Sequence, residues 1–432
     1  MAVVAERPAL TASVDIRHSP ASHHRRVATL TTIAGVALAL LAGRDGTLGW
    51  QIGRLAAITG LTIALVAVEI RLGDRGCGRI AVGVGVAALS IGLGFTPYAI
   101  KEGLSLEAVA GMVAAVVGLL LAMSGTVLAT RGRPVIWRLG AGVGTIVVAA
   151  LVAFVVAPAV AATNVPRPDL GATPASRGRA YETVTLSTAD GVRLAGWYVP
   201  STNRAAVVLL HGAGSTRSDV LDEAVVLASH GVGVLMIDAR GHGDSGGRAM
   251  DFGWHGDADI AAATGYLAVR PDVDRERIGV VGMSMGGEQA IGASASNPLI
   301  RAVVAEGATA RTADDEAWLS DQFGFPGFVQ EQLERVQDWI TDGLTSASVP
   351  TSLRRAVETS GDTRYLLITA GDVADEAHAA AYISAAAPER VRTWTVPDAG
   401  HTAGLHTQPR AWEERVIGFL TEALAAQSEK PR

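Results

Sequence analysis

A serine flanked by glycines follows a short apolar run in the second half of the chain. Residues 278–287 read Ile-Gly-Val-Val-Gly-Met-Ser-Met-Gly-Gly, which places Ser284 in a G-x-S-x-G pattern. A serine hydroxyl is a weak nucleophile unless a sharp strand-to-helix turn exposes it beside a base, and that turn needs residues without side chains around the serine. The helix expected after the turn would direct its first amides at the site, where they stabilise an anion. Ser284 is therefore predicted to be a nucleophile.

Three other stretches could supply its partners. Residues 209–215 read Leu-Leu-His-Gly-Ala-Gly-Ser after an early apolar run, and such a glycine-rich turn lets backbone amides approach a developing oxyanion. Residues 368–376 read Ile-Thr-Ala-Gly-Asp-Val-Ala-Asp-Glu after a late apolar run, and residues 399–402 read Ala-Gly-His-Thr after the last one. The chain order is therefore serine, acid, histidine, and His401 is the predicted base.

This order resembles that of the α/β-hydrolase superfamily. Residues 238–247, Asp-Ala-Arg-Gly-His-Gly-Asp-Ser-Gly-Gly, also resemble the D-x-R-G-x-G-x-S loop of its lipase, aminopeptidase and dienelactone-hydrolase-like branches. The resemblance covers about residues 181–426. It implies that Ser284 is the nucleophile, that His401 is the general base and later the acid, and that the amides of Met285 and Ala213 form the oxyanion hole.

The acid that orients His401 is the open position. Asp372 and Asp375 both follow the late strand, and Glu376 is a third choice. In the family that the chain resembles, the acid usually comes about three residues after a strand-ending glycine. Counting from Gly371 gives Ala374, so a shift of one residue favours Asp375 over Asp372.

Short apolar strands alternate with helical segments from residue 181 onward, which predicts a doubly wound, mostly parallel sheet. The expected strands are Tyr181–Ser187, Val192–Tyr198, Ala206–Leu210, Val232–Asp238, Ile278–Gly282, Arg301–Ala305, Tyr365–Ala370 and Val391–Val396. The expected helices are Arg217–His230, Ala258–Val269, Gly286–Asn297, Glu376–Ala387 and Ala411–Ala426.

The alternation breaks between residues 307 and 362. Val329, Leu333, Val336 and Ile340 form one stripe at helical spacing there. The insert is either a cap over the substrate pocket or a helical excursion that packs on the sheet edge, and the pattern does not separate the two.

The first part of the chain has the composition of a membrane protein. Five apolar segments can be drawn, at Val27–Gly43, Leu55–Leu72, Ile80–Ile100, Ala108–Ala129 and Leu139–Ala162. About 20 apolar residues are needed to cross a bilayer, and these segments are apolar all round, unlike core helices. The predicted organisation is a cytoplasmic tail (1–26), an α-helical transmembrane region of about five spans (27–162), a linker (163–180) and an α/β-hydrolase domain (181–426).

Cationic residues predict the orientation in the cytoplasmic membrane. Ten arginines fall on the side of the N-terminal tail, whereas Arg44, Arg54 and Lys101 fall on the other. The side richer in cations is the cytoplasmic one, so the tail lies inside and an odd number of spans places the hydrolase domain outside. Ionisable residues inside a membrane usually mark a transport path, and these spans are nearly free of them. Glu69 is the exception, and it lies near the Arg71 end. We therefore interpret this region as an anchor. Its small residues Gly140, Gly142 and Gly144 would suit close helix packing, including a homodimer contact.

Several other classes of function are disfavoured. The net charge of −6 and the lack of a basic stripe argue against a nucleic-acid partner. Cys77 is the single cysteine, so no intrachain disulfide can form, and it is expected to be passive at a membrane edge. No ligand spacing for a metal, no dinucleotide fingerprint and no phosphate loop is found, so neither a metal nor an organic cofactor is expected.

The resulting hypothesis is a membrane-anchored serine hydrolase that cleaves a small-molecule or lipid ester or thioester through an acyl-enzyme. A serine peptidase or amidase of the same fold is the alternative enzyme, because fold alone does not determine substrate. A non-catalytic ligand-sensing module linked to the membrane is the alternative outside enzymes, and the Ser284/His401 pair disfavours it because pure binding needs neither residue.

Overall fold

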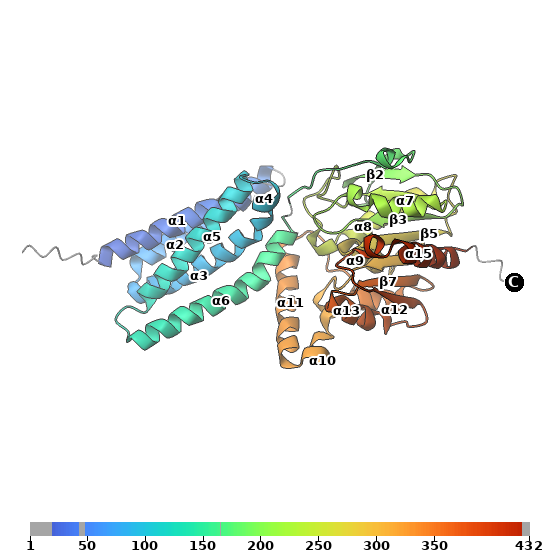
Figure 1. Cartoon of the computed structure of the whole chain (residues 1–432). Helices are drawn as coiled ribbons and strands as arrows, with labels where there is room; N and C mark the ends of the chain where they lie inside the picture. Colours follow the sequence, from blue (N-terminus) through green and yellow to red (C-terminus); the bar gives the residue numbers. More distant parts are fainter. Residues whose placement is uncertain (1–19, 43–47, 165, 426–432) are drawn as a thin grey trace, which may run out of the picture. The chain divides into compact units, whose positions relative to one another are not determined.

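The computed structural model describes residues 20–42, 48–164 and 166–425. The chain divides into two compact units, one formed by residues 1–89 and 113–150 and the other by residues 90–112 and 151–432. The second unit contains a sheet with helices on both faces (Figure 1).

Long helices account for the five apolar segments. They are α1 (Pro20–Ala42), α2 (Leu48–Arg71), α3 (Asp74–Gly94) followed by the short α4 (Thr96–Lys101), α5 (Leu106–Ala129) and α6 (Val135–Ala162). Five stretches of these helices are long and apolar enough to cross a membrane, as the sequence predicts. All five long helices begin before the predicted apolar segments, because polar residues such as Asp74 and Arg138 continue the helical backbone beyond the apolar stretch.

Glycines let α3 and α5 approach closely, but they are not the glycines that the sequence suggested. A Cβ on Gly85 would lie 2.5 Å from the backbone nitrogen of Ala122, and a Cβ on Gly118 would lie 2.4 Å from that of Leu89. Gly78 and Gly125 face each other in the same way one heptad away. A Cβ on Gly140, Gly142 or Gly144 would meet no described atom within 4 Å. These three glycines therefore make no close contact within the described chain, and their packing against a second copy stays a prediction.

Two further side chains of this unit are buried against neighbouring helices. Glu69 is only 1 % exposed, and its Oε1 accepts a hydrogen bond of 2.9 Å from the Thr31 hydroxyl on α1. Cys77 is a free thiol buried in the cluster that contains Val27 and Leu121. Glu69 lies two residues before the end of α2 and Cys77 lies three residues after the start of α3, and their positions at the edge of a membrane stay predictions.

An eight-stranded sheet forms the centre of the second unit, with the strand order β1-β2-β4-β3-β5-β6-β7-β8. Pairing is antiparallel between β1 and β2 and between β2 and β4, and parallel in all the remaining pairs. The strands are β1 (Glu182–Ser187), β2 (Arg193–Val199), β3 (Ala206–Leu210), β4 (Gly233–Ile237), β5 (Ile278–Met283), β6 (Ile300–Glu306), β7 (Arg364–Ala370) and β8 (Val391–Val396). The predicted mostly parallel, doubly wound sheet is confirmed.

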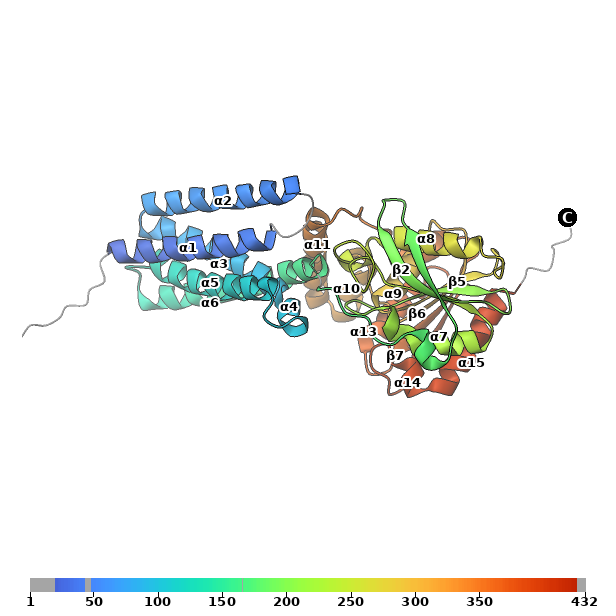
Figure 2. The ribbon, with the colours of Figure 1, turned by 90° about the horizontal axis from the view of Figure 1, so that it is seen from above.

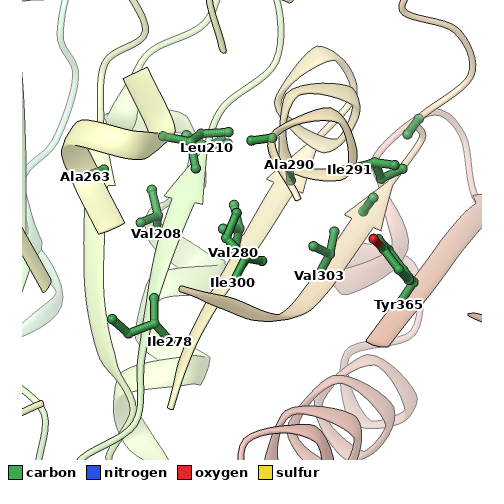
Figure 3. Packing of buried hydrophobic residues seen from close by; sticks show 14 of the residues in the cluster. Val208, Leu210, Ala263, Ile278, Val280, Ala290, Ile291, Ile300, Val303 and Tyr365 are labelled. Carbon is green, nitrogen blue, oxygen red and sulfur yellow. The ribbon is translucent and has the colours of Figure 1, made fainter. Parts of the chain in front are cut away.

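Alternating side chains divide the core of this sheet into two layers. Val208 and Leu210 point to one face, whereas Val207 and Leu209 point to the other. The first layer packs against α8 (Gly256–Ala268), α9 (Met285–Ala293), α12 (Leu353–Thr359) and α13 (Ala374–Ser384) (Figure 3). The second packs against α7 (Leu221–Ser229), the short α14 (Gly404–Thr407) and α15 (Pro409–Ala423), and Figure 2 shows α8 and α15 on opposite sides of the strands.

The segment between β6 and β7 is part insert and part core. It contains the turn η4 (Ala313–Glu316), α10 (Leu319–Phe323), α11 (Phe325–Leu344) and α12. Leu353 and Val357 of α12 belong to the main core, so the insert is shorter than the predicted 307–362. Val329 and Val336 of the predicted stripe remain exposed on α11, because the helix packs through another face.

Candidate functional site

Ser284 occupies a strained turn between β5 and α9. Its backbone has φ 53° and ψ −125°, a conformation that a non-glycine residue adopts only where the surroundings impose it. A Cβ on Gly282 would lie 2.2 Å from the carbonyl oxygen of Gly286, and one on Gly286 would lie 2.6 Å from that of His211. The glycines of the pentapeptide are therefore required by the turn that projects Ser284 from the sheet.

His401 lies against the serine, as the chain order predicts. The Ser284 hydroxyl is placed to donate to His401 Nε2 over 2.9 Å, and the opposite ring nitrogen, Nδ1, lies 2.7 Å from Oε1 of Glu376. A carboxylate only accepts, so Nδ1 carries the hydrogen and Nε2 is left as the acceptor for the serine. The structure thus brings together Ser284, His401 and Glu376.

The preference for Asp375 as the orienting acid is contradicted by this geometry, and so is the alternative Asp372. Both aspartates are exposed, whereas Glu376 is buried and its second oxygen accepts the amide of Ala370 at 2.7 Å. The physical reason is helical: α13 begins at Ala374, and neighbouring helical residues point about 100° apart. One of the adjacent carboxylates therefore faces solvent while the other faces His401.

The surroundings of His401 favour a charged imidazole. The hydrogen bond to Glu376 is the largest influence and raises the pKa of His401, while partial burial opposes it. Gly307, directly after β6, has φ +70°, and a Cβ there would lie 2.8 Å from His401 Cε1. The ring is thus fixed by the carboxylate at one edge and packs closely on a glycine backbone.

Two buried histidines connect the loops on the other side of Ser284. His211 Nε2 accepts the amide of Ala239 at 3.0 Å, and His242 Nε2 accepts the amide of Gly214 at 3.1 Å. Burial lowers the pKa of both rings, to about 3 for His242, so each is neutral and can accept through Nε2. These contacts join residues 211–214 to residues 239–242, so both histidines hold loops together.

The predicted oxyanion residues lie beside the serine. Met285 is the first residue of α9, and the first amides of a helix have no acceptor within it. The turn that contains Ala213 also lies against the nucleophile, because a Cβ on Gly212 would lie 3.2 Å from the Ser284 Cβ. The role of the Met285 and Ala213 amides as an oxyanion hole stays a prediction.

Two further buried carboxyl groups near the site were missed by the sequence reasoning. Glu306, at the end of β6, accepts the amide of Gly404 at 2.7 Å and the indole N–H of Trp412 at 2.8 Å. Glu288 on α9 accepts the amides of Thr309 and Ala310, and burial raises its pKa to about 7. The sequence did contain a signal for Glu306, because this residue directly follows the predicted strand Arg301–Ala305. The carboxyl ends of parallel strands share one edge of a sheet, and neighbouring strands carry Ser284 and Glu376 there.

No cluster of three or more histidine, cysteine or acidic side chains that could hold a metal ion occurs among the residues placed by the structure. The polar groups around Ser284 instead form a chain of hydrogen bonds from Glu376 through His401 to the serine. This arrangement can activate an alcohol and transfer a proton without further groups.

Sequence comparison supports the same fold. The sequence profile of the alpha/beta hydrolase family matches residues 207–415. An uncharacterized protein of Mycobacterium tuberculosis is 38 % identical over 118 residues, which cover 27 % of this chain and 41 % of that protein. A thiohydrolase of Aspergillus aculeatus is 32 % identical over 130 residues, covering 29 % of this chain and 41 % of the relative. The chain thus matches about two fifths of the length of these relatives.

A solved structure extends this likeness to most of the second unit. The esterase of Pyrococcus furiosus superimposes with a TM-score of 0.50 at 24 % identity, and the match covers 61 % of this chain and 98 % of the esterase. At that identity the likeness shows the fold. The family match and the eight-stranded sheet show that the domain carrying Ser284, His401 and Glu376 belongs to the alpha/beta hydrolase superfamily.

Proposed function

We propose that the protein is a membrane-anchored serine hydrolase that cleaves an ester or thioester through an acyl-enzyme. The observation that carries this proposal is the hydrogen-bonded series in which Ser284 Oγ lies 2.9 Å from His401 Nε2 and His401 Nδ1 lies 2.7 Å from Glu376. A ligand-sensing module would need neither a strained serine nor an oriented base.

The proposed reaction follows from the tautomer of His401. Nε2 takes the proton of Ser284 as Oγ attacks the substrate carbonyl carbon, and the resulting imidazolium is stabilised by the Glu376 carboxylate. The amides of Met285 and Ala213 stabilise the oxyanion. His401 then donates the proton to the departing alcohol or thiol, and the acyl group stays on Ser284. A water molecule, deprotonated by His401, releases the acid and restores the serine.

An ester or thioester is proposed ahead of an amide. One relative is named a thiohydrolase and the superimposed structure an esterase, and both leaving groups depart more readily than an amine. Five apolar helices precede the domain, so we propose a cell-membrane anchor. The excess of arginine on the side of the N-terminal tail further favours an outward-facing hydrolase domain.

The experiment is active-site labelling of the full chain with a fluorophosphonate, together with hydrolysis of p-nitrophenyl esters, thioesters and aminoacyl anilides. Wild type should be labelled, and Ser284→Ala should lose both labelling and ester hydrolysis. Ser215→Ala, in the nearby glycine-rich turn, is the matched control and should remain reactive. Equal labelling of Ser284→Ala would refute the serine mechanism, and faster anilide turnover would favour the peptidase alternative.

A further inference from the structure

Exposed apolar residues of the second unit gather on one insert. From residue 163 to 425, nine large apolar side chains of the described chain are exposed, and eight of them lie between Phe323 and Val349. The exception is Val269 at the end of α8. Scattered apolar residues need no explanation, but such a concentration marks an interaction surface.

Helix α11 carries most of this surface on a single face. Phe325, Phe328, Val329, Val336 and Trp339 recur at helical spacing, and we call these five residues the outer face of α11. Phe325 is 77 % exposed and Trp339 is 75 % exposed. The outer face is therefore presented to the surroundings along more than three turns of the helix.

The opposite face of α11 is fixed to the rest of the insert. Glu331 accepts the amide of Ser320 at 2.7 Å, and Asp338 accepts the amide of Ala313 at 2.8 Å. A Cβ on Gly327 would lie 2.0 Å from the carbonyl oxygen of Leu319, so the start of the helix is pressed against α10. The helix therefore cannot turn its apolar residues inward without losing these contacts.

The distribution of charge indicates what the outer face contacts. The five residues of the outer face and the central Gln332 carry no charge. The charged residues of α11 (Glu331, Glu334, Arg335, Asp338 and Asp342) lie beside or behind this face, and Arg335 pairs with Asp314 at 3.8 Å. Aromatic side chains next to a cation are typical of helices that lie in the interfacial layer of a bilayer. The uncharged outer face suits the apolar part of that layer, and its insertion requires no ion pair with a headgroup.

The covalent connection of the chain places a bilayer within reach. The apolar helices end at Ala162, and β1 begins at Glu182. The 19 residues in between, 163–181, span at most about 65 Å even when fully extended. With the apolar helices in a bilayer, as proposed above, a lipid surface stays within reach of α11 at high effective concentration, whereas a second copy would be met only at sufficient protein density.

We propose that the outer face of α11 is a membrane-docking surface that inserts into the interfacial layer of the bilayer. This docking would hold the hydrolase domain against the lipid surface, independently of its catalytic activity. The insert starts at Gly307 beside His401, so substrates carried in the bilayer would then be presented near Ser284.

The test uses the full chain in vesicles of phosphatidylcholine and phosphatidylglycerol, with Cys77→Ser as background. An environment-sensitive fluorophore is attached through Gln332→Cys, at the centre of the outer face, or through Val269→Cys as the matched exposed control. Quenching by spin-labelled lipid is then measured. We expect strong quenching at position 332 and little at position 269.

A second variant, Phe325→Ser with Trp339→Ser, removes two exposed aromatic residues without disturbing the buried side. Losing their burial should weaken docking on the order of a hundredfold and bring quenching at position 332 to the level at position 269. Equal quenching at both positions would overturn the proposal. Quenching that the double substitution leaves unchanged would also overturn it. Self-quenching of the fluorophore that depends only on protein density would overturn it as well, because it would indicate a second copy as the occupant. Fluorophosphonate labelling of the same samples reports separately on the proposed catalysis.

Discussion

Glu376→Gln is the substitution that most directly tests which carboxylate serves His401. The side chain keeps its size, and the amide oxygen can still accept the Ala370 N–H, so the fold of β7 and α13 should persist. The negative charge beside Nδ1 is lost. Asp375→Asn provides the matched control, because it makes the same chemical change one residue away on an exposed side chain.

The size of the effect follows from the position of Glu376. Its side chain is 1 % exposed and lies 2.7 Å from Nδ1, so its charge is little screened. At an effective dielectric constant of about 20 and a charge separation of about 4 Å, an ion pair with the imidazolium formed during reaction is worth roughly 4 kcal/mol. Each tenfold in rate corresponds to about 1.4 kcal/mol, so Glu376→Gln should lower kcat about a thousandfold. Asp375→Asn should change kcat less than about twofold.

The pH dependence gives a second, independent measure. His401 must be neutral to act as a base, so the rate rises with pH through the pKa of His401. Glu376 is the largest influence raising the pKa of His401 above 6.5. The midpoint of the rise in rate with pH should therefore lie above pH 6.5 in wild type and at a lower pH in Glu376→Gln. Steady-state hydrolysis of a p-nitrophenyl ester across pH, with circular dichroism to check folding, measures both effects. An equal loss in Asp375→Asn, or more than a tenth of the activity kept by Glu376→Gln, would refute the reasoning.

Two further substitutions probe the surroundings of the site. Gly307→Ala places a Cβ 2.8 Å from His401 Cε1 at a left-handed backbone position, so fluorophosphonate labelling should slow by roughly tenfold or more, and unchanged labelling would show that the ring can move aside. The folded-state pKa of Glu288 is raised from 4.5 to about 7, so wild type loses stability as pH rises between these values. Glu288→Gln should therefore be more stable than wild type above pH 7, by up to about 3 kcal/mol, and equally stable below pH 4.5. Thermal unfolding at both ends of this range measures the difference, and a constant offset would exclude titration of this carboxyl as its cause.

The order and spacing of residues in the sequence predicted the parallel sheet and the pairing of Ser284 with His401. Strands of a parallel sheet are continuous apolar runs with breaks at their ends, so all eight could be located to within a few residues. Ser284 and His401 follow two such strands directly, and the carboxyl ends of parallel strands share one edge of the sheet. Proximity of the two side chains was therefore predictable.

Tertiary structure alone decided among Asp372, Asp375 and Glu376. The sequence places all three after β7, but the start of α13 at Ala374 fixes which side chain points inward. The same holds for the insert: spacing predicted a helix containing Val329 and Val336, yet the hydrogen bonds of its acidic residues determine that this apolar face is the exposed one. Periodicity gives the relative angles between side chains on a helix, whereas its rotation about its own axis depends on contacts with residues distant in the chain.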